Sequence, residues 1–196
     1  FGGKGKGKKA RCETRLVQPL APLKKAKALK LVSKLSAPKK VRTPLGAAIA
    51  AVADDLGEVE GARIVVLVTD GDETCGGDPD AAIEALKASG IDVNVNIVGF
   101  ALEDQALKDQ MAAWAAAGGG NYYDASIADE LAASLAQALA APFRVYTAGT
   151  DEPLASGTVG GAGVLLEPGT YRVEVLSDPL VVFEDVIIEG GTDATL

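Results

Sequence analysis

The 196-residue chain has no histidine, and it contains only two cysteines, one methionine and one tryptophan. Histidine is the commonest general base and metal ligand in proteins, so its absence argues against a Ser-His-Asp hydrolase and against a histidine-based zinc site. No stretch approaches the roughly 20 consecutive apolar residues of a membrane span, and the sequence predicts no transmembrane segment. No signal peptide is recognisable, although a chain that starts at Phe1 rather than at methionine can already have been processed.

Positive charge is scarce outside the N-terminal quarter of the chain. Residues 1–45 carry 14 Lys and Arg and one acid, Glu13, which gives +13, whereas residues 46–196 carry 5 Lys and Arg and 26 acids, which gives −21. A basic arm of this kind can bind an anionic partner, pair with the acidic body or form a solvated face. Its glycine-lysine run, residues 3–9, has no aromatic side chains on which bases could stack, so the sequence does not favour nucleic-acid binding.

The most informative motif is TDGDE, residues 69–73, which follows the apolar run 64–68. An uncharged run of mostly β-branched residues predicts a strand covered on both faces, as in a parallel sheet. Asp70 would then lie at the carboxyl edge of that sheet, where open α/β folds bind their ligands. Twenty-seven residues earlier, Thr43 stands at the start of a predicted helix. A hydroxyl and a carboxylate that meet in one crevice suit a hard divalent cation such as Mg²⁺.

These residues carry a family resemblance. TPLG (residues 43–46) and VTDG (residues 68–71) are similar to the second and third elements of the metal-ion-dependent adhesion site of von Willebrand factor A domains. Their order, spacing and structural context agree with that family, and the resemblance covers roughly residues 1–141. The wider pattern TDGDETCGGDP, with a cysteine upstream, resembles a bacterial exported subgroup. The resemblance implies a doubly wound, mostly parallel α/β sheet.

The resemblance also implies the metal ligands. In this family serines, a threonine and aspartates hold the metal, and one coordination position is left for a carboxylate of the partner. Thr43 is therefore expected to be a direct ligand of Mg²⁺, or of Mn²⁺ or Ca²⁺, and Asp70 a direct or water-bridged one. Gly71 would let the backbone approach closely, and Asp72 and Glu73 are nearby acids that the family pattern does not make ligands. Without a metal, Thr43 would be a helix cap and Asp70 a turn-forming acid.

One element of the family is missing. Nothing before Thr43 resembles the Asp-x-Ser-x-Ser motif of the first strand, and residues 1–3 look like the tail of the second strand. Since the first strand would lie beside residues 64–68, its absence would leave a bare, aggregation-prone edge in the sheet. Either the chain is a fragment of a longer polypeptide, or the domain is degenerate and something else covers the edge. Thr43 and Asp70 alone would hold Mg²⁺ only weakly.

Cys12 and Cys75 are the only cysteines. In the fold that the resemblance implies, they lie in two loops at the carboxyl edge of the sheet, and the bacterial subgroup implies that they form a disulfide. Such a bond, closing about 63 residues, would contribute roughly 4 kcal/mol through chain entropy. It would imply an oxidising compartment, the periplasm or the exterior, whereas two unpaired thiols would suit a cytosolic chain. A metal site made of two cysteines alone lacks further soft ligands and is not expected.

Strands that alternate with helices predict a parallel sheet in the partial von Willebrand factor A domain, residues 1–141. Asp78 is expected to cap one helix, and Ser126 with Asp129 to form a capping box for another. The expected helices are residues 23–35, 44–56, 79–89, 103–117 and 127–141, and the expected strands are residues 14–18, 64–69, 93–98 and 121–123.

The pattern of residues changes at Pro142: the helical periodicity stops, and short runs of strand-favouring residues begin. Strands are expected at residues 143–146, 163–166, 171–176 and 181–188. The stretch LEPGTYRVEV resembles the small antiparallel β-sandwich modules that are appended to exported proteins. Residues 142–196 are therefore interpreted as a β-sandwich-like module, which is small for an independent core and can continue past Leu196.

The leading hypothesis is a non-enzymatic, exported protein-binding or adhesion module that recognises an acid of its partner at the metal edge. The alternative is a structural or assembly subunit, whose sheet is completed without metal by an upstream segment or by a second chain. A metal-dependent hydrolase would rely on Asp70, Asp72 and Glu73, but no positioned base or nucleophile can be named. The sequence does not identify the partner.

Overall fold

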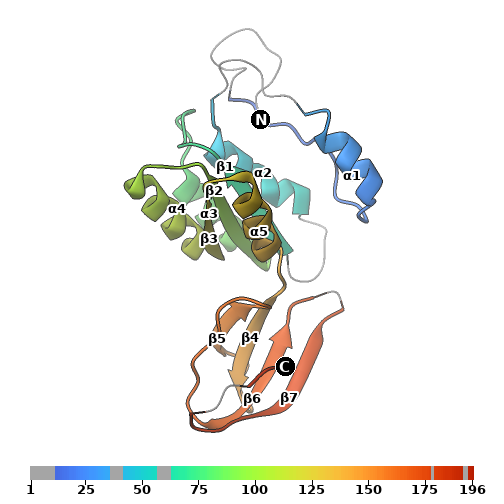
Figure 1. The fold of residues 1–196 in the computed structure, drawn as a ribbon, viewed down its shortest axis with the longest axis vertical. Coiled ribbons are helices and arrows are strands. Elements are labelled where there is room, and N and C mark those ends of the chain that lie inside the picture. Colours follow the sequence, from blue (N-terminus) through green and yellow to red (C-terminus); the bar gives the residue numbers. More distant parts are fainter. Residues whose placement is uncertain (1–11, 36–41, 57–62, 178, 192–193) are drawn as a thin grey trace.

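The computed structural model describes residues 12–35, 42–56, 63–177, 179–191 and 194–196, which form an α/β domain followed by a small β domain (Figure 1). The helices of the α/β domain are α1 (Lys25–Val32), α2 (Leu45–Leu56), α3 (Pro79–Ala88), α4 (Gln105–Ala117) and α5 (Ala128–Ala138). Its strands are β1 (Arg63–Thr69), β2 (Val93–Phe100) and β3 (Gly119–Ala125). The strands of the β domain are β4 (Pro142–Thr147), β5 (Pro153–Thr158), β6 (Gly169–Val175) and β7 (Val181–Ile188).

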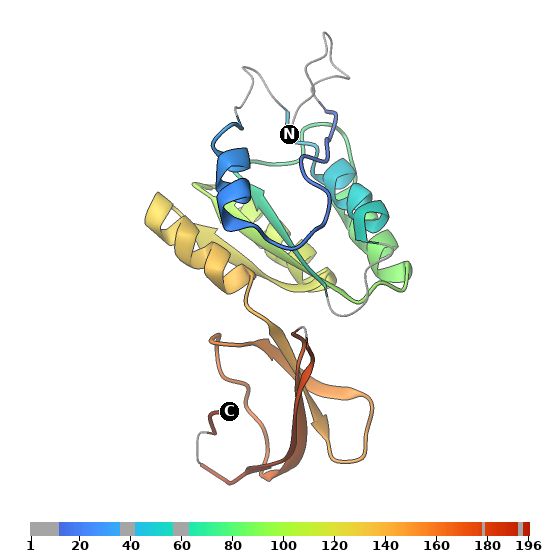
Figure 2. The same ribbon diagram turned by 90° about the vertical axis from the view of Figure 1, so that its right-hand side faces the viewer.

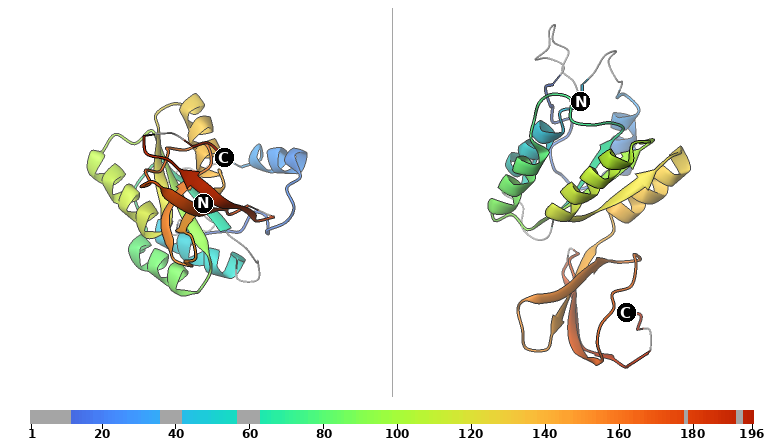
Figure 3. Two further views of the ribbon diagram at one scale, coloured as in Figure 1. Left: turned by 90° about the horizontal axis from the view of Figure 1, so that it is seen from below. Right: turned by 90° about the vertical axis from the view of Figure 1, so that its left-hand side faces the viewer.

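The described strands of the α/β domain form a parallel sheet in the order β1-β2-β3, as the alternation of elements predicts. Helices α2, α3 and α4 pack on one face of this sheet, and α5 packs on the other (Figure 3). The main core lies between the sheet and the three helices, where Ile83, Ile97 and Met111 are fully buried. Each such side chain contributes about 1.5–3 kcal/mol when it leaves water, so this layer holds the strand ends in place.

The carboxyl ends of the strands lie side by side at one edge of the sheet. Thr69 at the end of β1 pairs with Gly99 of β2, and Gly99 pairs with Asp124 of β3. The loops that follow these strands therefore share that edge. Figure 1 shows that this edge lies at the end of the domain far from the β domain.

The outer edge of β1 has no neighbour among the described strands. Arg63 donates its backbone N–H to the carbonyl of Asp92, on the β2 side. Because successive residues of a strand direct their backbone groups to opposite sides, those of Ile64, Val66 and Val68 point away from β2. The bare edge that the sequence predicts is thus present in this part of the chain.

The segment before α2 departs from the sequence-based expectation. Residues 14–18 are not a strand, because no strand in the described ranges runs beside them to form hydrogen bonds. Helix α1 ends at Val32 instead of reaching residue 35, and none of its residues is buried (Figure 2). The exposed apolar side chains of this segment are Leu16, Val17, Leu20, Leu23, Leu29, Val32 and Leu35.

The helix caps are mostly as expected, with one correction. Asp78 accepts a hydrogen bond from the Ala81 N–H and caps α3. At α5, however, the backbone N–H of Ser126 donates to Glu130 rather than to Asp129, over 2.7 Å. The cap residue of α5 is Ile127, whose side chain makes no capping hydrogen bond, so the capping box expected from Ser126 and Asp129 does not form.

The β domain is one antiparallel sheet in the order β5-β4-β6-β7, and the described residues form no second layer that would make a sandwich. Residues 163–166 are not a strand, and β5, which has little β-branched content, was not expected. Val145, Tyr171 and Val173 form the centre of its small core.

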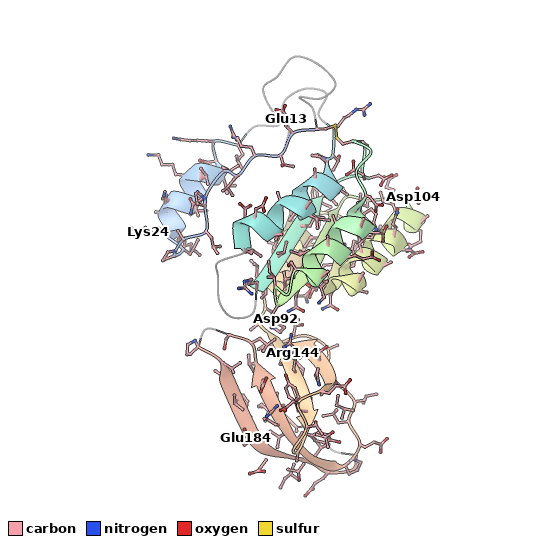
Figure 4. All side chains as sticks on the ribbon, turned by 180° about the vertical axis from the view of Figure 1, so that it is seen from behind. Glu13, Lys24, Asp92, Asp104, Arg144 and Glu184 are labelled. Carbon is pink, nitrogen blue, oxygen red and sulfur yellow. A yellow bond between two sulfur atoms is a disulfide. The ribbon has the colours of Figure 1, made fainter. Side chains whose placement is uncertain are left out.

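An ion pair joins the two domains. The guanidinium of Arg144, on β4, lies 2.7 Å from the carboxylate of Asp92, which directly precedes β2 (Figure 4). The β domain thus lies at the amino edge of the parallel sheet, at the opposite end of the strands from the carboxyl edge.

Candidate metal centre and partner-binding edge

The entrance of α2 is bound to the loop that follows β1. The backbone N–H of Thr43 donates to the hydroxyl of Thr74 over 2.7 Å, and the N–H of Thr74 donates to the carbonyl of Thr43 over 3.0 Å. Arg42 adds a third contact, from its guanidinium to the Thr74 carbonyl at 2.8 Å. These bonds join residues about thirty positions apart and bring the two sequence motifs together.

Glu73 caps the N-terminus of α2 from this loop. One oxygen of its carboxylate accepts from the Gly46 N–H at 2.9 Å, and the other accepts from the Cys75 N–H. Burial alone would raise the pKa of Glu73, but hydrogen bonds from backbone amides outweigh it and lower the pKa below its ordinary value. Those amides belong to Gly46, Cys75, Gly77 and Leu45. A carboxylate at a helix N-terminus is also favoured by the helix dipole.

These hydrogen bonds predict a loss of stability in acid. Because the folded protein lowers the pKa of Glu73 from 4.5, the contribution of its carboxylate is fully present above that value and is lost as the pH falls through the lowered pKa. Urea unfolding between about pH 7 and about pH 3 should show wild type and Glu73→Gln converging in stability at the acid end. A constant difference across that range would contradict the prediction.

Gly46 and Gly77 allow this close approach of α2 and the loop. A Cβ atom at Gly46 would lie 2.8 Å from the backbone nitrogen of Asp78, closer than packed atoms tolerate. A Cβ atom at Gly77 would lie 3.1 Å from the Glu73 carboxylate. A side chain at the glycine position of the TPLG motif would therefore clash with the backbone of this loop.

Thr43 and Asp70, the two expected ligands, both present oxygens at this edge. A Cβ atom built on Gly71 would lie 4.0 Å from the Thr43 hydroxyl, so this hydroxyl faces the loop that carries Asp70. Asp70 is exposed directly after β1. Neither the Thr43 hydroxyl nor the Asp70 carboxylate has a hydrogen-bond partner among the described residues.

Thr69 shapes the turn on which Asp70 lies. Its buried hydroxyl donates to the Gly71 carbonyl at 2.8 Å and accepts from the Gly71 N–H at 3.3 Å. Asp72 is exposed and accepts from the N–H of Glu73 at 2.7 Å. The nearby acids thus differ: the Glu73 carboxylate accepts from backbone amides, whereas no described residue donates a hydrogen bond to the Asp70 carboxylate.

The described side chains do not by themselves make a complete metal cage. No group of three or more Asp, Glu, Cys or His side chains in these ranges could hold an ion. A hydroxyl and one carboxylate are nevertheless oxygen donors of the kind that Mg²⁺ and Mn²⁺ prefer, and Mg²⁺ commonly keeps several waters. The donor set fits a hydrated divalent cation and leaves room for further oxygens.

A disulfide joins Cys12 to Cys75, with their Cα atoms 5.6 Å apart, as expected from the sequence. The bond connects the N-terminal segment to the loop of Glu73 and Thr74, at the carboxyl edge (Figure 4). It closes a separation of 63 residues.

Comparison with known protein families gives a match over most of the α/β domain. Residues 7–137 match the von Willebrand factor type A domain. The chain belongs to this family. The matched residues include Thr43 and the loop after β1. The match confirms the family resemblance that was drawn from the two motifs. Domains of this family generally mediate protein–protein interactions.

Two proteins of Bacillus subtilis (strain 168) are similar to part of this VWA protein. The uncharacterized protein YwmD is 49% identical over 73 residues, which are 37% of this chain and 32% of YwmD. The uncharacterized protein YwmC is 40% identical over 68 residues, 35% of this chain and 29% of YwmC. The matched regions thus span about a third of these relatives or slightly less.

A solved structure is also similar to this VWA protein. It is an aerotolerance-related membrane protein from Bacteroides fragilis NCTC 9343, with 24% sequence identity and a TM-score of 0.43, over 57% of this chain and 65% of that chain. In the described parts of the present chain, every helix is too short or too polar to cross a bilayer.

Sequence reasoning did not find the roles of Glu73, Thr74 and Thr69. Glu73 was noted only as a nearby acid, because helix caps are normally sought just before the helix that they serve. Its partner Gly46 lies 27 residues away. The one local feature that could have indicated these roles is that an acid, Glu73, and a hydroxyl, Thr74, closely follow the TDG motif.

Proposed function

We propose that this VWA protein is an exported, non-enzymatic protein-binding module that holds Mg²⁺ or Mn²⁺ at its carboxyl edge and binds an acid of its partner there. The observation that carries the proposal is the Thr43 hydroxyl, which faces the loop of Asp70, while neither group has a hydrogen-bond partner in the part of the chain that the structure describes. Two free oxygen donors on facing segments suit a hydrated cation with an exchangeable position. A carboxylate from the partner would fill that position.

The arrangement of the domains supports a binding role at this edge. The β domain packs at the amino edge through Arg144 and Asp92, so a large partner can reach the carboxyl edge without meeting it (Figure 1). The disulfide suits an oxidising compartment, the periplasm or the exterior of the cell. Glu73, which a hydrolase would need as a free acid, is instead engaged by backbone amides.

Paramagnetic Mn²⁺ tests the metal site directly. In a ¹⁵N-labelled sample we expect added Mn²⁺ to broaden the amide signals of Thr43, Asp70 and Gly71 before those of β4–β7, and EDTA to restore them. With only two protein donors the dissociation constant should be on the order of a millimolar, and Mg²⁺ should compete. Broadening confined to other acidic surfaces, or none at all, would overturn the proposal.

The bare edge of β1 favours a second candidate, an assembly subunit whose sheet is completed by an upstream segment or by another chain. Beside this edge lies a hollow of 390 Å³. The apolar residues that line it are Leu16, Pro19, Leu20, Ala21, Val52, Leu56, Ile64 and Val65. Free backbone groups next to an apolar lining suit an added β-strand.

Native mass spectrometry separates the two candidates. Sheet completion predicts a bound peptide or second chain that persists in EDTA, because strand pairing needs no metal. A purified chain that is monomeric and free of bound peptide would exclude completion of the sheet by a second chain or by a separate peptide.

A further inference from the structure

Helix α1 and the residues that flank it present a surface to solvent. None of the residues of α1 is buried, and Figures 1 and 3 place the helix at the periphery of the α/β domain. We call residues 23–35 the α1 surface. Its exposed apolar side chains are Leu23, Leu29, Val32 and Leu35, and its exposed basic side chains are Lys24, Lys25, Lys27, Lys30 and Lys34. A group of exposed apolar side chains of this kind marks a surface that contacts another molecule.

The two kinds of side chain lie on different faces of α1. Lys27 and Lys30 are three residues apart and share one face, and Leu29 and Val32, which are 61% and 62% exposed, share another. A helix turns by about 100° per residue, so the two pairs lie on nearly opposite sides of its axis. A basic helix with a separate apolar face is typical of segments that lie in the surface of a membrane.

The charge of the protein favours an anionic occupant for this surface. Residues 14–35 contain five Lys and one Arg and no acid, whereas residues 46–196 carry a net charge of −21. Within the described ranges no acid forms an ion pair with the lysines of the α1 surface. An anionic surface would attract this segment and repel the rest of the protein, and would therefore meet the molecule with α1 towards it.

We propose that the α1 surface docks onto an anionic lipid membrane. Helix α1 lies in the plane of the headgroups, Leu29 and Val32 insert among the acyl chains, and the lysines contact the lipid phosphates. An acidic protein suits this surface less well. A groove that binds a helix reads apolar side chains at i, i+3, i+4 and i+7, and the eight residues of α1 expose only the pair Leu29 and Val32. A lipid surface requires no such fixed spacing.

This surface is separate from the two sites proposed above. The hollow beside β1 is lined by residues between 16 and 21 and by α2 and β1, and not by α1. Docking on lipid also needs neither Thr43 nor Asp70. The proposal therefore stands independently of the metal and of the added strand.

Cosedimentation of the whole, disulfide-bonded protein with vesicles tests the docking. We expect binding to vesicles of phosphatidylglycerol and phosphatidylcholine in equal amounts, and none to vesicles of phosphatidylcholine alone. Raising the ionic strength from about 0.1 M to about 1 M shortens the Debye length from about 10 Å to about 3 Å and should release the protein. Residues 1–11 are also rich in lysine, so variants of α1 are needed to assign the binding to this helix.

Two single substitutions, each with a matched control, make that assignment. Lys30→Gln should weaken vesicle binding about fivefold, the usual effect of one lysine near an anionic surface. Lys87→Gln removes an exposed lysine from α3 and should leave binding unchanged. Leu29→Gln should weaken binding about tenfold by removing an inserted side chain, while Leu139→Gln, which removes an equally exposed leucine next to α5, should not.

The tryptophan reports whether each variant is folded, because Trp114 is buried in the core at 2% exposure. Absence of binding to the anionic vesicles, or equal binding to the neutral ones, would overturn the proposal. So would wild-type binding by Leu29→Gln with weakened binding by Lys30→Gln. That outcome would mean adsorption by charge alone, as expected of a surface for an acidic protein. Wild-type binding by both variants would assign the adsorption to another segment and would equally overturn it.

Discussion

Replacing Cys12 and Cys75 with serine is expected to lower the free energy of unfolding by about 4 kcal/mol. The bond closes a separation of 63 residues, and its removal gives the unfolded chain much more freedom. The N-terminal segment depends on this bond in particular, because α1 buries none of its residues. Urea unfolding of the double variant and of wild type, with and without a dithiol reductant, measures the effect.

The reductant supplies the control for this prediction. Wild type in a dithiol should approach the double variant, and the double variant should be insensitive to it, since its only thiols are gone. Limited proteolysis should then cut first between residues 12 and 35. A double variant as stable as oxidised wild type would show that the disulfide is not what holds this segment.

Thr43→Ala and Asp70→Ala are each expected to abolish Mn²⁺-dependent broadening at Gly71, while the domain stays folded. Each change removes one of the two protein oxygens, and a single remaining donor cannot compete with water for the cation. Both side chains are at least partly exposed, so their loss opens no cavity in the core. The measurement is the Mn²⁺ titration, with circular dichroism to establish that each variant is folded.

Asp80→Asn is the matched control for these two variants. Asp80 is an exposed acid in the first turn of α3, so this change removes one negative charge from the same domain without touching the loop of Asp70. It should leave the titration unchanged. Equal loss of broadening in Asp80→Asn would mean that Mn²⁺ responds to overall negative charge, and residual broadening in Asp70→Ala would remove this residue from the ligand set.

Local patterns in the sequence predicted most of the α/β domain. Helix periodicity and the cap at Asp78 located α2, α3 and α4 to within a residue or two of their observed ends, because these signals come from residues close together in the chain. The prediction of a strand at residues 14–18 was wrong because a strand depends on contacts with a distant part of the chain. A strand needs a hydrogen-bonding neighbour, and propensity alone does not provide one. β5 was missed because PLASGT has few of the side chains that favour strands.

The site was predicted in part. Its two motifs and the pairing of the cysteines followed from the resemblance, but the contacts that hold Thr43 did not. Glu73 and Thr74 act on residues roughly thirty positions away, and such a contact exists only after the sheet has brought α2 and the loop after β1 together. Whether Thr43 and Asp70 bind a cation is a prediction that the Mn²⁺ titration addresses.

The attachment of the β domain at the amino edge has a mechanical consequence. A partner held near Asp70 and an anchor beyond Arg144 would pull the sheet along the direction of its strands. The backbone hydrogen bonds of a sheet lie across that direction, so many of them would bear the load at once in shear instead of opening one after another.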